Sequence, residues 1–253
     1  MDYVRCTACG LVQQHPMPAD VSPFYSAYPV HAQKGWVHER VRRALLSHAY
    51  FDASQLAAES VLLDYGCGDG WYLDSLATTG SQRLGYEPDS NQAKRVERQI
   101  GVPIFSNLEQ LVAEWEGRVD QIVMHFVLEH VTNLRDTLAF LVSLLKPGGQ
   151  IYAVVPNLDS REFRLFGKRW HGFDAPRHTI FPDATSLQKA GENLPLTLLR
   201  STYVRFPNTF AGSMAIRLRG HYVHSLFLLC LPLGIVWSLF DPTGNQCFVW
   251  RKD

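Results

Sequence analysis

The sequence lacks the charge imbalance that marks proteins with highly charged partners. Its 253 residues carry 24 Lys and Arg against 24 Asp and Glu, and no basic run is long enough to form a nucleic-acid-binding patch. The first residues, MDYVRCTACG, lack the apolar core of a signal peptide. We therefore expect a cytoplasmic protein without a nucleic-acid partner.

Cysteine is also scarce. The chain has five cysteines, and Cys6-x-x-Cys9 is not followed by the second such pair that would complete a structural zinc site. The odd number and the wide spacing of Cys67, Cys230 and Cys247 favour a reducing compartment over a disulfide framework. We predict that Cys6 and Cys9 bind no zinc.

Hydrophobic residues make up 46% of the chain, which is enough for one large core. Short apolar runs predict strands at 61–65, 83–87, 101–105, 120–125 and 150–155, and amphipathic segments predict helices at 70–79, 89–99, 107–116 and 133–145. Pro147-Gly148-Gly149 is expected to close the last of these helices. Such alternation predicts an α/β fold with a parallel sheet and helices on both faces.

The remaining segments complete the predicted organisation. Residues 1–50 are expected to form a mostly irregular cap followed by a lead-in helix at 34–51. The core would span 51–205, with a helix at 182–191, a strand at 194–204 and a substrate loop at 156–182. An apolar helical insertion or lid at 206–243 and a final core strand at 244–253 would follow.

The clearest motif is the glycine-rich turn from Asp64 to Gly70 after the first strand. Its spacing is G-x-G-x-G, whereas dinucleotide-binding turns have G-x-G-x-x-G and face a pyrophosphate. The Asp64 carboxylate would oppose a phosphate but suits the ammonium and sulfonium of S-adenosylmethionine (SAM), and Glu87 ends the second strand where it can accept hydrogen bonds from ribose hydroxyls. The motif favours SAM over the alternative, a nicotinamide-dependent oxidoreductase.

These motifs give the chain a family resemblance. LLDYGCGDG, GYEPD, DQIVMHFVLEHV and LLKPGGQIYAVVPN resemble, in order and spacing, the motifs of class I SAM-dependent methyltransferases over residues 60–200. The Cys-x-x-Cys-Gly start and the segment at 156–187 are similar to a bacterial subgroup often associated with polysaccharide, lipid or secondary-metabolite pathways. The resemblance implies a Rossmann-like, mostly parallel sheet with an antiparallel last strand, and SAM as the cofactor.

The resemblance also implies a set of cofactor-binding residues. The glycine-rich turn would flank the methionine part of SAM, Glu87 would hold the ribose, and His125 would lie near the reacting methyl group. The complete expected set is Asp64, Gly66, Cys67, Gly68, Gly70, Glu87, Pro88, Asn107 and His125.

Glu129 and His130 follow the fourth strand and resemble a site in quinone-biosynthesis O-methyltransferases that is associated with a divalent metal. In that pattern an acidic residue precedes Glu129 by three positions, where this chain has Phe126. The missing oxygen ligand favours a structural role for the pair and no bound metal. A role for His130 as general base stays open.

A second group of histidines lies in the predicted substrate loop. His171 and His178 flank Asp174 and Arg177, so the loop either contacts an anionic or hydroxylated acceptor or orders its own backbone. With the histidine that ends the fourth strand and the one that follows it, the candidates for a catalytic base are His125, His130, His171 and His178.

The apolar stretch at 221–240 is about as long as a bilayer span, which takes ~20 residues. Pro232 interrupts it, and a returning strand at 244–251 would leave both flanks on one side of a membrane. We expect a helical hairpin broken at Pro232. It would either contact a membrane surface, with Arg217 and Arg219 facing anionic headgroups, or form a buried lid.

The sequence thus predicts a SAM-dependent methyltransferase that acts on a small-molecule acceptor, with a hydroxyl favoured as the methylated group. The resemblance suggests a sugar, a lipid-linked intermediate or a secondary metabolite. The alternative is a non-catalytic scaffold of the same fold in a membrane-associated complex. The sequence predicts no oligomeric state.

Overall fold

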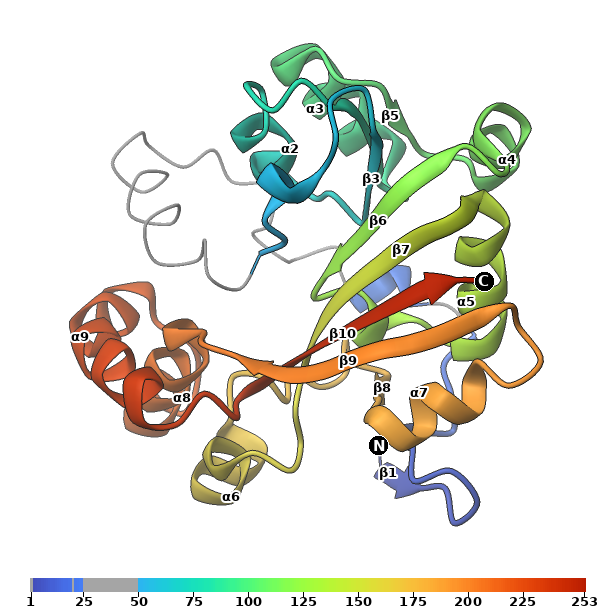
Figure 1. The fold of residues 1–253 in the computed structure, drawn as a ribbon. Coiled ribbons are helices and arrows are strands. Elements are labelled where there is room, and N and C mark those ends of the chain that lie inside the picture. The colour runs from blue at the N-terminus through green and yellow to red at the C-terminus, as the bar shows by residue number, and fades with distance from the viewer. Residues whose placement is uncertain (1, 20, 25–49) are drawn as a thin grey trace.

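The computed structural model describes residues 2–19, 21–24 and 50–253. The predicted lead-in helix at 34–51 therefore lies, up to residue 49, outside the described residues. Within them, the dominant feature is a seven-stranded sheet of order β5-β4-β3-β6-β7-β10-β9 (Figure 1).

Most strands of this sheet run parallel. β3 (Val61–Tyr65), β4 (Gln82–Tyr86), β5 (Ile104–Phe105), β6 (Val119–His125) and β7 (Leu145–Pro156) pair in parallel. β10 (Asn245–Lys252) is antiparallel to both β7 and the edge strand β9 (Leu196–Val204). The predicted fold class, including the antiparallel last strand, is confirmed.

Helices cover both faces of the sheet because neighbouring strand residues point to opposite sides. Leu62 and Val123 pack with α2 (Trp71–Ser75) and α3 (Ser90–Ile100), whereas Leu63 and Ile122 pack with α4 (Leu108–Trp115), α5 (Leu134–Leu144) and α7 (Ala184–Ala190). The Asp89, Asn107 and Asn133 side chains cap α3, α4 and α5, which fixes where these helices begin.

Two predicted boundaries differ from the structure. The strand expected at 101–105 contains only Ile104 and Phe105, because Gly101 ends α3 with φ +66°. Pro147-Gly148-Gly149 does not close a helix. α5 ends at Leu144, and the tripeptide lies within β7 where the register with β6 is irregular.

The N-terminal residues contribute two short strands to a second, small sheet, which the sequence analysis does not predict. β1 (Asp2–Arg5) and β2 (Val12–His15) make an antiparallel hairpin, and β2 also pairs with β8 (Ile180–Phe181). The Tyr3 ring contacts Phe173 and Phe181, and its hydroxyl donates to the His178 carbonyl at 2.6 Å. The hairpin thereby braces the loop that precedes β8.

A helical hairpin follows β9 at the end of the sheet (Figure 1). Its helices are α8 (Pro207–Arg219) and α9 (His224–Phe240), and α6 (Arg161–Phe166) packs nearby. The predicted break at Pro232 is wrong, because α9 continues through this residue and the turn follows Gly220, which has φ +80°. By length and hydropathy, none of the helices in the described residues qualifies as a membrane span.

Candidate functional site

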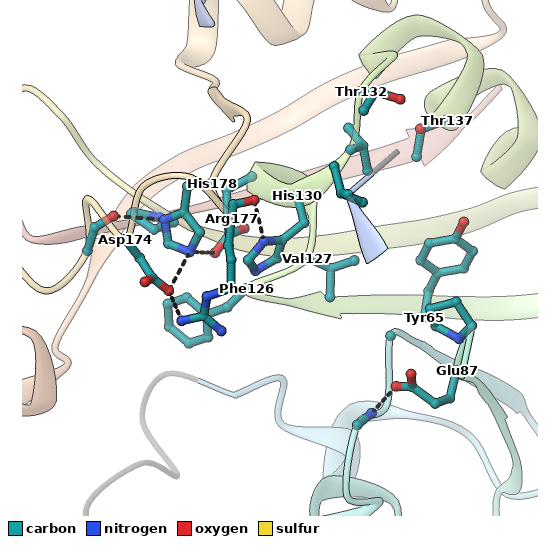
Figure 2. A pocket seen from close by; sticks show the side chains of 18 of the residues that line it. Tyr65, Glu87, Phe126, Val127, His130, Thr132, Thr137, Asp174, Arg177 and His178 are labelled. Carbon is teal, nitrogen blue, oxygen red and sulfur yellow. Dashed lines mark hydrogen bonds and ion pairs between the residues drawn. The ribbon is translucent and has the colours of Figure 1, made fainter. Parts of the chain in front are cut away.

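A cavity of about 1130 Å³ opens beyond the ends of β3, β4 and β6. One end is lined by the glycine-rich turn and by Glu87, and the other by residues that follow β6 and by the loop before β8 (Figure 2). This is the general position of ligand sites in open α/β sheets, outside the carboxyl ends of the strands.

The glycine-rich turn has a backbone that only glycine adopts readily. Gly66, Gly68 and Gly70 have φ values of +85°, +56° and +72°. Gly66 also lies against the next loop, since a Cβ there would come within 2.6 Å of Val127 Cγ2. The turn is held to β4, because the amides of Gly66 and Cys67 donate to the Tyr86 carbonyl at 2.8 and 2.9 Å.

The Glu87 side chain also holds the glycine-rich turn. Its carboxylate accepts from the Gly68 amide (Figure 2) and from the Asp89 amide, each at 3.1 Å. Burial raises the pKa of Glu87 to about 7, although these two hydrogen bonds lower it. Glu87 therefore accepts hydrogen bonds from the backbone and also lines the cavity wall.

Two tyrosines line this end of the cavity, and the sequence analysis does not predict them. Tyr65 and Tyr86 stack with ring centroids 4.7 Å apart, and both line the cavity. Each is the last residue of its strand, β3 or β4. The signal was available, because terminal residues of adjacent parallel strands lie side by side at one edge of the sheet.

The predicted cofactor residues divide into two groups. Gly66, Gly68, Glu87 and Pro88 line the cavity. The others support it from outside: Asp64 is buried in β3, Cys67 lies under Gly85, Gly70 begins α2, and Asn107 caps α4.

His125 is not brought to the cavity. Its ring is surrounded by Tyr50, Tyr72 and Tyr152, with centroid distances of 4.3, 4.6 and 5.8 Å. Nε2 accepts from the Phe51 amide at 3.2 Å, and Nδ1 lies 3.9 Å from Asp64 Oδ1. This environment gives His125 a packing role.

The other end of the cavity is assembled from two distant segments. Glu129 and His130 lie in the 3-10 helix η5 (Leu128–His130), and His178 precedes β8. Thr179 joins the segments, because its amide donates to the Glu129 carbonyl at 2.8 Å and its hydroxyl to the Val131 carbonyl at 2.7 Å. Ligand atoms of Glu129, His130 and His178 consequently lie within 4.8 Å of one another.

Backbone carbonyls set the tautomers of both histidines. His130 Nδ1 is 3.0 Å from the Arg177 carbonyl, and His178 Nδ1 is 2.9 Å from the Gly172 carbonyl (Figure 2). A carbonyl only accepts, so Nδ1 carries the proton in each ring and Nε2 presents a lone pair. Burial is the main cause that lowers the pKa of both histidines to about 3.

Glu129 has an unusual environment for a carboxyl group. The side chain is fully buried, neither carboxylate oxygen has a hydrogen-bond partner among the residues that the structure describes, and His178 Nε2 lies 3.9 Å from Oε1. Burial raises the pKa of Glu129 well above its usual range. A buried charge without partners is costly, whereas two imidazole nitrogens and a carboxylate oxygen are suitable ligands for a divalent transition metal.

Other residues of the predicted substrate loop also line the cavity. Asp174 pairs with Arg177, and Asp174 Oδ2 lies 3.8 Å from His178 Nε2. His171 lines the wall, and its amide donates to Ser213 Oγ at 2.8 Å. Phe126 stands where the related pattern has an acid, but its ring packs against Phe206, so it contributes apolar surface only.

The fold and the cavity together define a Rossmann-like domain of the class I methyltransferase type. A family model described as "Methyltransferase domain" matches residues 36–201, and the chain belongs to this family. The expectations of a methyltransferase and of SAM as its cofactor are thereby confirmed at the level of the family.

Named relatives agree with this assignment, and solved structures agree with the fold. Ubiquinone biosynthesis O-methyltransferases are 29% identical over 122 residues in Chromobacterium violaceum (46% of this chain, 53% of the relative) and 27% identical over 192 residues in Bordetella pertussis (68% and 72%). The chain spans about half the length of the first relatives it matches. The crystal structure of geranyl diphosphate C-methyltransferase from Streptomyces coelicolor A3(2) has a TM-score of 0.56 at 16% identity, covering 88% of this chain and 82% of that one. The cyclopropane synthase MmaA2 from Mycobacterium tuberculosis has 0.52 at 16%, covering 90% and 88%.

Proposed function

We propose that this protein transfers a methyl group from SAM to a hydroxyl of a small-molecule acceptor. The observation that carries the proposal is a cavity that joins a wall built by the glycine-rich turn and Glu87 at one end to the Glu129, His130 and His178 cluster at the other. The names of the O-methyltransferase relatives support oxygen as the methylated atom.

The first end suits the cofactor. SAM supplies an electrophilic methyl group on a sulfonium and carries no phosphate. The positive-φ turn lets backbone approach a ligand closely at Gly66 and Gly68, and the Glu87 carboxylate is the acceptor for ribose hydroxyls. The stacked Tyr65 and Tyr86 rings add an apolar surface beside it.

The second end suits the acceptor. Histidines with a pKa of about 3 take a proton from a hydroxyl poorly, which weakens the general-base role expected for His130 and His178. Their unprotonated Nε2 atoms and the Glu129 carboxylate, which has no hydrogen-bond partner within the described part of the chain, fit a divalent cation instead. Such a cation would lower the pKa of an acceptor hydroxyl. Our expectation of no metal rested on Phe126 and did not include His178 as a third ligand.

The cofactor assignment is tested by calorimetric titration with SAM and S-adenosylhomocysteine. Glu87→Ala should weaken binding about tenfold or more, because it removes the acceptor for two hydroxyls. Glu97→Ala, an exposed acid on α3, is the matched control and should bind as the wild type does. No binding by folded wild-type protein would refute the proposal and favour the scaffold alternative.

A further inference from the structure

The α8–α9 hairpin has an exposed apolar face that the proposed reaction does not use. On α9, the side chains of Leu228, Leu229, Leu233, Val236, Leu239 and Phe240 are 49–80% exposed. They recur at helical spacing and form one side of the helix, here called the outer face. The inner side is apolar as well, with Phe227 and Cys230 packed against α8. A helix that is apolar all round normally has both sides covered.

The hairpin is too firmly packed for the outer face to turn inward. A Cβ on Gly234 would lie 2.4 Å from the Pro207 carbonyl oxygen, so the two helices approach closely. Phe210 and Trp237 stack across them with centroids 4.8 Å apart. The outer face therefore remains available to a partner.

Charge around the outer face indicates the kind of partner. No Asp or Glu occurs between Glu192 and Asp241, and Asp241 is buried. Arg217 and Arg219 are exposed at the end of α8, beside the turn that leads into α9. An apolar face with a basic end and no acid complements anionic headgroups above acyl chains. A second copy of the hairpin would offer no acid to these arginines.

Pro232 limits how deeply the face can insert. It has no amide hydrogen, so the Leu228 carbonyl loses its partner within the helix. An unpaired carbonyl is costly in hydrocarbon but is satisfied by water or headgroups. Shallow insertion parallel to the surface meets this requirement.

The hairpin is directly connected to the acceptor end of the cavity. Tyr222, in its turn, stacks on His171 with centroids 5.4 Å apart, and His171 lines the cavity. Phe206 and Thr209, at the start of α8, line the cavity too. A membrane under the hairpin would therefore lie close to the acceptor-binding wall.

We propose that the outer face docks on an anionic lipid surface and that the acceptor is a lipid-tailed molecule taken from this surface. The docking stands on the hairpin alone. The choice of acceptor rests on the proposed function and deepens it.

Docking is tested by flotation of the purified protein with vesicles. Binding should be about tenfold tighter to phosphatidylglycerol–phosphatidylcholine mixtures than to phosphatidylcholine alone. Leu229→Glu with Leu233→Glu should weaken binding about tenfold or more, and Arg217→Gln with Arg219→Gln should remove most of the preference for anionic lipid. Leu199→Glu, an exposed leucine on β9, is the matched control and should have no effect.

Titration with SAM on the same samples separates the two proposals. Vesicle binding without SAM binding would overturn the proposed function and leave docking intact. Docking is overturned if the wild type binds none of the vesicles, or if the Leu229→Glu, Leu233→Glu protein binds vesicles as tightly as the wild type does. It is also overturned if light scattering finds a lipid-free dimer that this double substitution separates. Docking without faster methylation of a lipid-tailed phenol in vesicles than of its soluble analogue would refute the lipid-tailed acceptor.

Discussion

The two ends of the cavity are built by different means. The cofactor end is made largely of backbone, with a turn of three positive-φ glycines within a few residues of one another. The acceptor end is made of side chains from η5 and from the loop before β8, which meet because Thr179 bonds to the Glu129 carbonyl. Ligand binding at the first end should therefore be sensitive to side-chain atoms added to the glycines. Activity at the second end should be sensitive to replacement of the functional groups.

The largest effect is expected at the acceptor end. Glu129→Gln or His178→Ala should lower turnover about 10²–10⁴-fold, because either change removes a group from the reacting site. SAM affinity should change less than twofold, since neither residue lies at the Glu87 end. Steady-state kinetics with parallel calorimetry measure both.

A histidine outside the cavity provides the control, and chelation provides a second readout. His15→Ala, an exposed residue on β2, should leave turnover unchanged. A chelator should slow the wild type strongly and have little further effect on His178→Ala. Equal sensitivity of both proteins to the chelator would argue against the three-residue cation site.

At the cofactor end, Gly66→Ala should weaken SAM binding roughly 10–100-fold, in line with strain of about 1–3 kcal/mol at an unfavourable φ. The added methyl would also meet Val127 at 2.6 Å. Gly80→Ala is the matched control, because φ is +74° there but no atom of the described residues lies within 4 Å of a Cβ. Calorimetry should show lost affinity only for Gly66→Ala; equal affinities would mean that the turn does not approach the ligand.

This contrast explains what the sequence predicted well. The strands of the sheet and the glycine-rich turn depend on short apolar runs and on local backbone preferences. Both can be recognised from a few neighbouring residues. Glu87, which lines the cavity, was predicted as a site residue for the same reason, as the acidic residue just after β4. Tyr65 and Tyr86 required only the further step of pairing adjacent strand ends.

The Glu129, His130 and His178 cluster could not be predicted from local sequence in this way. Glu129 and His178 are 49 positions apart, and the segments that carry them are held together by the hydrogen bonds of Thr179. The pattern that resembled a metal site lacked its acid at Phe126, and no local signal identified His178 as the replacement. Side-chain clusters of this kind depend on long-range packing, which one sequence does not reveal.

A smaller effect is expected from pH at the cofactor end. Because burial raises the pKa of Glu87 to about 7, half of the carboxyl groups are protonated at that pH and the ionised form prevails above it. Affinity for S-adenosylhomocysteine should therefore rise about tenfold from pH 6 to pH 8 in the wild type. Glu87→Gln should bind more weakly and lack this rise. Titration of the ligand itself affects both proteins equally. If the plots of affinity against pH were parallel for the wild type and Glu87→Gln, Glu87 would be excluded as the source of the rise.

The smallest effect on turnover is expected at His125, which the resemblance placed beside the reacting methyl group. The ring lies outside the cavity among three tyrosines and accepts a hydrogen bond from the Phe51 amide. Its loss should therefore affect stability more than turnover. His125→Phe keeps the ring packing and leaves the amide unpaired, at a cost of about 1–3 kcal/mol in the free energy of unfolding. Turnover of the folded protein should stay within about threefold of the wild type. Denaturant unfolding and kinetics on the same preparation separate the two, and a loss of turnover as large as that of His178→Ala would restore His125 to the reaction.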